Sequence, residues 1–380
     1  MTPLELKSNS TANAGEAPRR RVLLVSNRVM HYRVSVYNYF WEQFQKNGWD
    51  FSVITNELQQ QNRIPPKFKL TVTPFDFWAY RRHIQELKPD VVILFLHLRD
   101  RIVWPLLHWL KLAGIPVVSW TKTRNLDDAE NPIRNAAFNY VHRLCDGLIL
   151  YTDNLIKYLP PSQHHKVFVA NNTINFQDFP EVSESKEAIK NALGISFQKI
   201  VLFVGRIGEE KNRKKVDHLI EMFRELKRDD LGLVIVGSGL SPEHQARINP
   251  KNTLYLGEIH DPKNEQISRI FKMADISSIP GHVGLGLNQA FFWGLPMVTE
   301  EGLQPPEICY LEHGRNGFIV PEDDVVALRE RILYLADNDS VRAEFSTNAQ
   351  ADIQQRASTE GMFQGFLKCA EYVTAKKSPK

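Results

Sequence analysis

Two successive series of short apolar runs, separated by stretches with helical spacing, constrain the fold of this chain most strongly. The first series occupies residues 22–26, 51–55, 91–95, 117–120, 148–151 and 167–169, and the second occupies 200–204, 233–236, 253–256, 276–279, 297–299 and 318–320. Helical spacing is found at 34–44, 102–112, 133–144, 287–293, 325–336, 340–357 and 361–375. Strands that alternate with helices favour parallel sheets covered on both faces, with ligands beyond the carboxyl ends of the strands. The sequence therefore predicts an α/β chain with two doubly wound domains.

The 380 residues are enough for two domains of ordinary size. Residues 1–18 are small and polar, and we expect a disordered tail there. The first domain is predicted at 19–172 and the second at 199–357, joined by a polar linker at 173–198 with a short helix. A last helix, within 358–380, is expected to pack back on the first domain.

Composition limits the functions that the chain can have. No apolar run approaches the ~20 residues that cross a bilayer, and the first residues have no apolar signal core. Cys145, Cys309 and Cys369 lie far apart, so the sequence predicts neither a disulfide framework nor a metal cluster. We therefore expect a cytoplasmic protein.

Charge is distributed unevenly along the chain. Residues 1–170 contain 22 Lys and Arg against 14 Asp and Glu, and the remainder contains 25 against 30. A basic first half favours an anionic lipid surface, as in peripheral contact with the inner face of a membrane, or a phosphorylated acceptor. Scattered, solvated charges are the alternative explanation. Nucleic acid is not an expected partner, because no binding motif accompanies the charge.

One stretch, residues 274–320, has the order strand, glycine-rich turn, helix, strand. The turn contains Gly281, Gly284 and Gly286, and Gly294 closes the helix. A turn of this kind directs backbone N–H groups and a helix N-terminus at one spot, which attracts a phosphate. Glycine turns that serve packing alone remain the alternative.

Two further loops follow predicted strands of the second domain. The first carries Gly205, Arg206 and Lys211, and its two cations can neutralise a diphosphate. The second is a tight turn at Gly237. Solvated basic side chains are the alternative explanation for the first loop.

Several segments, taken in order, resemble the C-terminal domain of a family 4 glycosyltransferase, a retaining enzyme of the GT-B fold. They read FVGRIGEEK, IVGSG, LYLGEI, KMADISSIPGHVGLGLNQAFFWGLPMVT and PEICYLEHGRNGFIV. The donor loop is similar to that of a subgroup with the pattern PGxVGL. The resemblance implies two Rossmann-like domains that face across a cleft, with C-terminal helices crossing back.

The resemblance also implies a nucleoside-diphosphate sugar as donor, with no cofactor and no metal. Arg206 and Lys211 would stabilise the departing diphosphate, with Lys214 or Lys215 as substitutes for Lys211. Backbone N–H groups near Gly284 and Leu285 would assist.

The remaining donor contacts follow from the same likeness. They are the glycine loops at Gly205 and Gly237, a base pocket near Ile259, and polar contacts from Gln289 and Glu307.

The chain departs from the family pattern at three positions. Many members have two glutamates where this sequence has Gly281 and Gln289. Glu307 is a candidate for the missing carboxylate near the ribose, although it also reads as a helix-start residue. Many members have a histidine where this sequence has Lys122, which is a poor base at an ordinary pKa.

Other candidates lie in the first domain. His31 and Arg33 flank its first loop on the acceptor side, although His31 is equally explained as a solvated histidine. His97 is a less favoured candidate, and Asp127, Asp128 and Glu130 are expected to cap the helix that follows them.

Two function classes follow. The first is a retaining, metal-independent glycosyltransferase with a lipid-linked or polysaccharide acceptor. The second is a nucleotide-sugar-binding partner subunit with little or no catalysis, which the missing acidic pair and Lys122 favour. A third, an epimerase, lacks the acidic and histidine groups that it would need.

Overall fold

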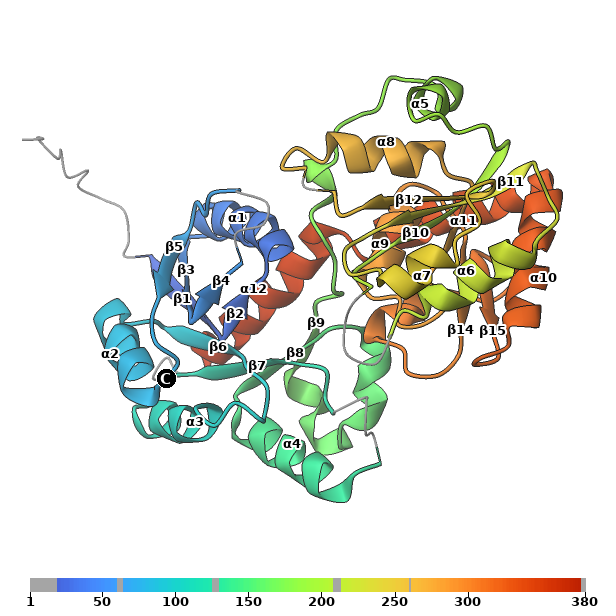
Figure 1. Cartoon of the computed structure of the whole chain (residues 1–380). Helices are drawn as coiled ribbons and strands as arrows, with labels where there is room; N and C mark the ends of the chain where they lie inside the picture. Colours follow the sequence, from blue (N-terminus) through green and yellow to red (C-terminus); the bar gives the residue numbers. More distant parts are fainter. Residues whose placement is uncertain (1–18, 60–63, 125–129, 208–212, 260, 377–380) are drawn as a thin grey trace, which may run out of the picture.

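The computed structural model describes residues 19–59, 64–124, 130–207, 213–259 and 261–376. Two parallel sheets form the two domains (Figure 1). The first sheet has the strand order β5-β3-β1-β6-β7-β8-β9 and the second has the order β12-β11-β10-β13-β14-β15. This is the predicted α/β class with two Rossmann-like sheets.

The strands of the first domain are β1 (Arg20–Ser26), β2 (Arg28–Val29), β3 (Trp49–Thr55), β4 (Glu57–Leu58), β5 (Lys69–Val72), β6 (Val91–Phe95), β7 (Val117–Thr121), β8 (Gly147–Leu150) and β9 (Val167–Val169). Its helices are α1 (His31–Lys46), α2 (Phe77–Leu87), α3 (Val103–Leu112) and α4 (Pro132–Leu144). The two-residue strands β2 and β4 pair with each other outside the main sheet.

The strands of the second domain are β10 (Lys199–Val204), β11 (Leu231–Val236), β12 (Thr253–Gly257), β13 (Ile276–Ser278), β14 (Met297–Glu300) and β15 (Gly317–Val320). The helices of the linker, the second domain and the C-terminus are α5 (Lys186–Ala192), α6 (Val216–Glu225), α7 (Pro242–Ala246), α8 (Glu265–Met273), α9 (Leu285–Phe292), α10 (Val325–Asp337), α11 (Asp339–Arg356) and α12 (Thr359–Ala375).

The central strands explain why apolar runs mark the sheets. In β1 the residues from Val22 to Val25 have no exposed surface, because β3 and β6 flank the strand and helices cover both faces. A strand of a parallel sheet that is buried on both faces must be apolar throughout. The same holds for β10 and β11 in the second sheet.

The last helix, α12, packs on the first sheet although it follows the second domain in sequence (Figure 1). Phe363 and Phe366 are buried there, with ring centroids 5.0 Å from Phe44 and 4.8 Å from Phe40, respectively. Close aromatic pairs of this kind stabilise beyond the area that they bury. The helix therefore ties the end of the chain to its beginning.

Four local features differ from the sequence-based expectations. Strand β5 and helix α2 were not predicted, because β5 is a partly exposed edge strand and α2 buries only Tyr80 and Ile84. His31 is the first residue of α1 rather than part of a loop. Asn131, not Glu130, caps α4, since its side chain accepts a hydrogen bond from the N–H of Arg134. Residues 1–18, and the predicted capping residues Asp127 and Asp128, lie outside the described part of the chain.

Candidate active site

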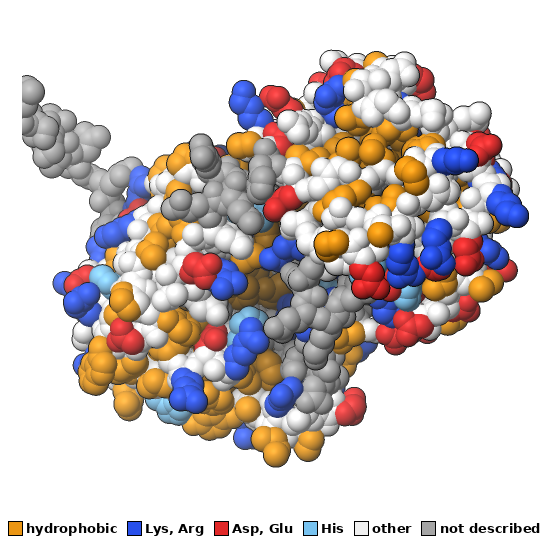
Figure 2. Space-filling model, viewed as in Figure 1, with side chains coloured by type: hydrophobic (Ala, Val, Ile, Leu, Met, Phe, Trp, Pro, Cys, Tyr) orange, Lys and Arg blue, Asp and Glu red, His pale blue; other side chains and the backbone are white. Residues whose placement is uncertain are grey.

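A cavity of about 800 Å³ lies between the two domains, where Figure 2 shows a recess. Strand ends and following loops of the first domain form most of its wall, and loops of the second domain close it. The described residues that line it are Asn27, Phe95, Leu96, His97, Leu98, Arg99, Trp104, Trp120, Thr121, Lys122, Arg124, Ile133, Arg134, Ala137, Phe138, Tyr151, Arg213, His282, Gln304 and Pro305. They include five Lys and Arg but no Asp or Glu. Anions are therefore the natural ligands of the described wall.

The glycine turn after β13 meets the loop before α6. The N–H of His282 donates to the backbone oxygen of Arg213 (2.7 Å). A Cβ at Gly281 would lie 2.0 Å from that same oxygen, so a side chain cannot be placed there without moving the loop. Residue 281 must therefore be glycine in this chain, because two backbones meet at that point.

Gln304 braces the same turn from the other side. Its Oε1 accepts from the N–H of Val283 (3.2 Å), and its Nε2 donates to the backbone oxygen of Gly281 (2.9 Å). Among the described residues, no side chain caps α9, whose N-cap is Gly284. The N–H groups near Gly284 and Leu285 thus remain uncapped by a side chain at a helix N-terminus, where anions are stabilised. The sequence analysis missed Gln304, which no local pattern marks.

The loops after β10 and β11 touch each other. A Cβ at Gly237 would lie 1.8 Å from the backbone oxygen of Gly205, and the φ of Gly237 is 149°. Lys214 packs across Gly205 and donates from Nζ to the backbone oxygen of His282 (2.9 Å). Lys214 therefore connects the cationic loop to the glycine turn. Lys211 lies outside the described residues.

Arg206 follows β10, and its side chain is exposed. Burial lowers the pKa of His31, a hydrogen bond with Gln59 opposes this, and the charge of Arg206 lowers the pKa further. Glu258 also acts on His31, in the opposite direction. These effects place Arg206 and Glu258 near His31 of the first domain, although Arg206 is not among the described residues that line the cavity.

Lys122 follows β7 at the cavity and lies against Tyr151, with Nζ 5.3 Å from the ring centroid. Thr123, the next residue, has a φ of 68°, which is unusual for a β-branched side chain. Its N–H donates to Oγ1 of Thr121 (3.0 Å). This local strain fixes the direction in which the chain leaves β7, and strain of this kind gathers at functional sites.

His97 follows β6, the neighbour of β7, and also lines the cavity. Burial lowers the pKa of His97, Asp100 opposes this, and the charges of Arg99 and Lys122 lower the pKa further. A neutral imidazole beside Lys122 can accept a hydrogen bond. The sequence alone does not place His97 beside Lys122, because a local pattern shows each strand end separately.

Glu307, the candidate for a ribose contact, lies in a buried network. Arg33 donates to Oδ1 of Asn172 (2.5 Å) and to the backbone oxygen of Thr173 (3.3 Å), and Asn172 donates in turn to Glu307. Asn288 of α9 donates to the backbone oxygen of Asn172 (2.9 Å). The network links α1, the linker and the second domain.

Three other predicted contacts occupy distinct places. Leu285 is the first residue of α9, Gln289 is half-buried in the same helix, and Ile259 is half-buried just after β12.

Lys215 is held in a separate cluster. Its Nζ lies 3.1 Å from Glu300 and 2.6 Å from Asp323, and His218 Nδ1 lies 2.6 Å from Glu300. Lys215 therefore pairs with acidic side chains and is not among the described cavity-lining residues. This position does not support Lys215 as a substitute for Lys211. His218, Glu300 and Asp323 are close enough to share a metal ion, but an ammonium group already supplies positive charge there.

We expect this cluster to make stability depend on pH. The hydrogen bond to Glu300 raises the pKa of His218, and burial acts against that rise. The negative charges of Glu300 and Asp217 raise the pKa further, and the positive charge of Lys215 lowers it. A histidine with a raised pKa stabilises the fold fully below its unfolded pKa and loses this contribution as the pH rises through the folded value. Wild type should therefore lose more unfolding free energy between about pH 6 and about pH 9 than His218→Gln. Urea denaturation at both pH values measures this, and equal losses would contradict it.

None of the helices among the described residues is long and apolar enough to cross a membrane.

Comparison with known proteins gives two kinds of likeness. Residues 198–338 match the family model "Glycosyl transferases group 1". The chain is 25% identical over 171 residues to poly(ribitol-phosphate) alpha-N-acetylglucosaminyltransferase of Staphylococcus aureus. The matched region covers 43% of this chain and 34% of that protein. It is 26% identical over 152 residues to spore coat protein SA of Bacillus subtilis, and this matched region covers 37% of this chain and 40% of that protein. The chain thus spans about a third to two-fifths of these relatives.

The structural likeness covers nearly the whole chain. HepE of Anabaena, solved in complex with UDP, superposes with a TM-score of 0.72 at 15% identity, over 92% of this chain and 98% of that one. At this identity the likeness shows the fold alone. The chain therefore has the GT-B fold, and its residues 198–338 match the group 1 glycosyl transferases.

Proposed function

We propose that the chain is a retaining glycosyltransferase that moves a sugar from a nucleoside-diphosphate donor to a lipid-linked or glycan acceptor. One observation carries the proposal: a cavity lined by five Lys and Arg lies between the domains, and two loops of the segment that matches the family model reach it, the glycine turn through His282 and the loop before α6 through Arg213. The UDP bound to HepE, a protein of the same fold, supports a nucleoside diphosphate as part of the donor.

The chemistry asks the protein mainly to stabilise charge. The bond between the anomeric carbon and the diphosphate oxygen breaks while the acceptor oxygen bonds to the same carbon, and the acceptor proton passes to the departing phosphate. Arg206 and Lys211, with the N–H groups near Gly284 and Leu285, would stabilise the negative charge on the diphosphate. This route requires neither a protein base at Lys122 nor a metal, so we expect activity to survive chelators.

The remaining candidate contacts belong to the donor. Gln289 offers an amide to a hydroxyl of the sugar or ribose, and Ile259 offers an apolar surface to the base. Glu307 is 4% exposed and bonded to Asn172, so a contact with the ribose would require the network to open.

The first test is a thermal-shift screen of nucleoside diphosphates and their sugars. A donor at about a hundred times its Kd adds about 2.7 kcal/mol of stability and raises Tm accordingly. The donor that binds is then incubated with lipid and glycan acceptors, and release of the nucleoside diphosphate is measured. A chain that binds no donor would refute the proposal.

The second candidate function is a donor-binding partner subunit. Lys122 in place of a histidine and Gln289 in place of a glutamate favour this second function. Gly281 in place of a glutamate is weaker support for it, because this chain needs glycine there for steric reasons. It predicts a donor-dependent rise in Tm without nucleoside diphosphate release, and a catalytic protein that co-purifies with the chain.

A further inference from the structure

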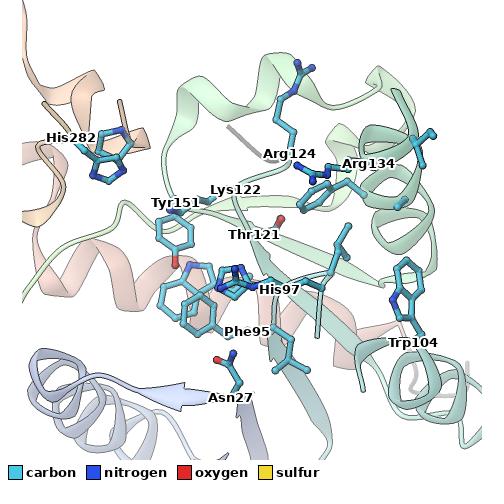
Figure 3. A pocket seen from close by; sticks show the side chains of 18 of the residues that line it. Asn27, Phe95, His97, Trp104, Thr121, Lys122, Arg124, Arg134, Tyr151 and His282 are labelled. Atoms are coloured by element: carbon cyan, nitrogen blue, oxygen red, sulfur yellow. The ribbon is translucent and has the colours of Figure 1, made fainter. Parts of the chain in front are cut away.

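The loop before α6 (residues 213–215) and the glycine turn are joined through their backbones. The N–H of His282 donates to the backbone oxygen of Arg213 (2.7 Å), and the N–H of Gly281 donates to that of Lys214 (3.1 Å). Arg213 and His282 both line the cavity, and in Figure 3 His282 lies across the cavity from Lys122. The second-domain side of the cavity therefore depends on how these two segments are held together.

Glu300, the last residue of β14, is a buried carboxylate at this junction, and its side chain has no exposed surface. Its Oε1 lies 2.6 Å from Nδ1 of His218. Its Oε2 accepts from Nζ of Lys215 (3.1 Å) and from the N–H of Asp323 (3.0 Å). Burial alone would raise the pKa of Glu300, but the hydrogen bonds from His218, Asp323 and Lys215 hold it below its ordinary value. The carboxylate is therefore charged at neutral pH.

The side chain of Glu300 holds the loop at its last residue. Lys215 is the N-cap of α6 and has a left-handed backbone, with a φ of 49°, which is uncommon for lysine. An ammonium group at a helix N-terminus also opposes the helix macrodipole. The buried carboxylate of Glu300 offsets both costs, together with the exposed carboxylates of Glu322 and Asp323. Glu300 therefore fixes the point at which the loop ends and α6 begins.

The backbone of Glu300 holds the glycine turn at the same time. Its N–H donates to the backbone oxygen of Pro280 (2.8 Å), and its backbone oxygen accepts from Nε2 of Gln304 (2.9 Å). The same nitrogen of Gln304 donates to the backbone oxygen of Gly281 (2.9 Å). One residue thus contacts both segments, the turn through its backbone and the loop through its side chain.

We propose that Glu300 is a positioning residue that fixes the loop before α6 against the glycine turn, so that both segments face a bound diphosphate. The inference rests on the proposed function, because the diphosphate belongs to the donor. It adds a residue that is not among the described residues lining the cavity and that acts only through its neighbours. A preorganised site avoids the cost of ordering its loops when the ligand binds. Loss of the carboxylate should therefore weaken binding more than it slows the chemistry.

The test measures the affinity of the nucleoside diphosphate that the thermal-shift screen identifies. Titration calorimetry compares wild type with Glu300→Gln, which keeps the shape of the side chain and removes its charge, and with Lys215→Met. If the two segments of a variant occupy the binding arrangement only about a tenth of the time, the apparent Kd rises about tenfold. We expect a rise of about this size in both variants. The KM for the donor should rise with it, while kcat at saturating donor stays near that of wild type.

Two control variants separate positioning from general stability. Glu322→Gln makes the same chemical change in an exposed partner of Lys215, and an exposed ion pair contributes little. Ile189→Ala removes a fully buried side chain of α5 and lowers stability at a position outside both segments. Both controls should bind the nucleoside diphosphate as wild type does.

The double variant Glu300→Gln/Lys215→Met gives the sharpest comparison. Each single substitution breaks a charge pair that is buried on the Glu300 side, which lowers Tm. The double variant removes both charges, so Tm should recover in part while Kd stays weak. Hydrogen exchange of residues 281–284 in the free protein provides a readout without ligand, and it should be faster in the double variant than in Ile189→Ala. If Glu300→Gln alone does not fold, Lys215→Met and the double variant carry the same comparison.

The inference is overturned if the double variant equals Ile189→Ala in both Kd and hydrogen exchange, or if its Kd recovers together with Tm. Normal binding by wild type in that case would leave the proposed function intact. A wild type that binds no nucleoside diphosphate would refute the proposed function, and the exchange rates alone would then decide whether Glu300 holds the two segments together.

Discussion

Replacing Arg206 by alanine should lower turnover about 10²–10³-fold, which is the usual effect of removing one group that stabilises a departing negative charge. Arg206 follows β10 and is near enough to His31 of the other domain to lower its pKa. Since the side chain is exposed, the substitution should leave Tm unchanged. The measurement is release of nucleoside diphosphate under saturating donor and acceptor.

Two variants sharpen this prediction. Arg82→Ala removes an exposed arginine of α2 that is not among the described cavity-lining residues, and it should retain full turnover. Arg206→Lys keeps the charge without the planar fork and should recover part of the loss. An Arg206→Ala enzyme as active as Arg82→Ala would show that Arg206 does not contact the departing group.

Replacing Asn172 by alanine should destabilise the protein by about 3–5 kcal/mol, because it leaves a buried guanidinium and a buried carboxylate without their shared partner. Arg33 and Glu307 are each 4% exposed, so water cannot replace the lost amide. The loss should appear as a lower urea midpoint in denaturation experiments at neutral pH.

Asn47→Ala is the matched control, since the Asn47 amide donates only to the backbone oxygen of Gln43 at the exposed end of α1. Its effect should stay within about 0.5 kcal/mol, as for most surface substitutions. If Asn172→Ala unfolds at the same urea concentration as Asn47→Ala, the buried network does not hold the linker to the two domains.

The sequence specified the sheets because their strands are buried on both faces. The run 91–95 coincides with β6 (Val91–Phe95), and the other apolar runs agree with their strands within about two residues. Where burial is incomplete the pattern fails: β5 has no fully buried residue and α2 has two, so neither element carries a strong apolar signal.

The site was predictable only as a set of strand ends. Arg206, Lys122 and the glycine turn follow predicted strands, and parallel topology brings such ends together. Local sequence cannot report which neighbours a side chain meets. Lys214 and Lys215 are adjacent, yet Lys214 donates to the glycine turn while Lys215 pairs with Glu300 and Asp323.

Local sequence was thus enough to predict the α/β class, the order of the strands along the chain and the positions of the glycine and cationic loops, because these depend on local periodicity and on residue type. The tertiary structure alone decided why residue 281 must be glycine, which arginines line the cavity, and that Arg33 meets Asn172 across 139 positions of sequence. The physical reason is distance: steric contact, hydrogen bonding and the shift of a pKa act over a few ångströms in space, whatever the separation along the chain.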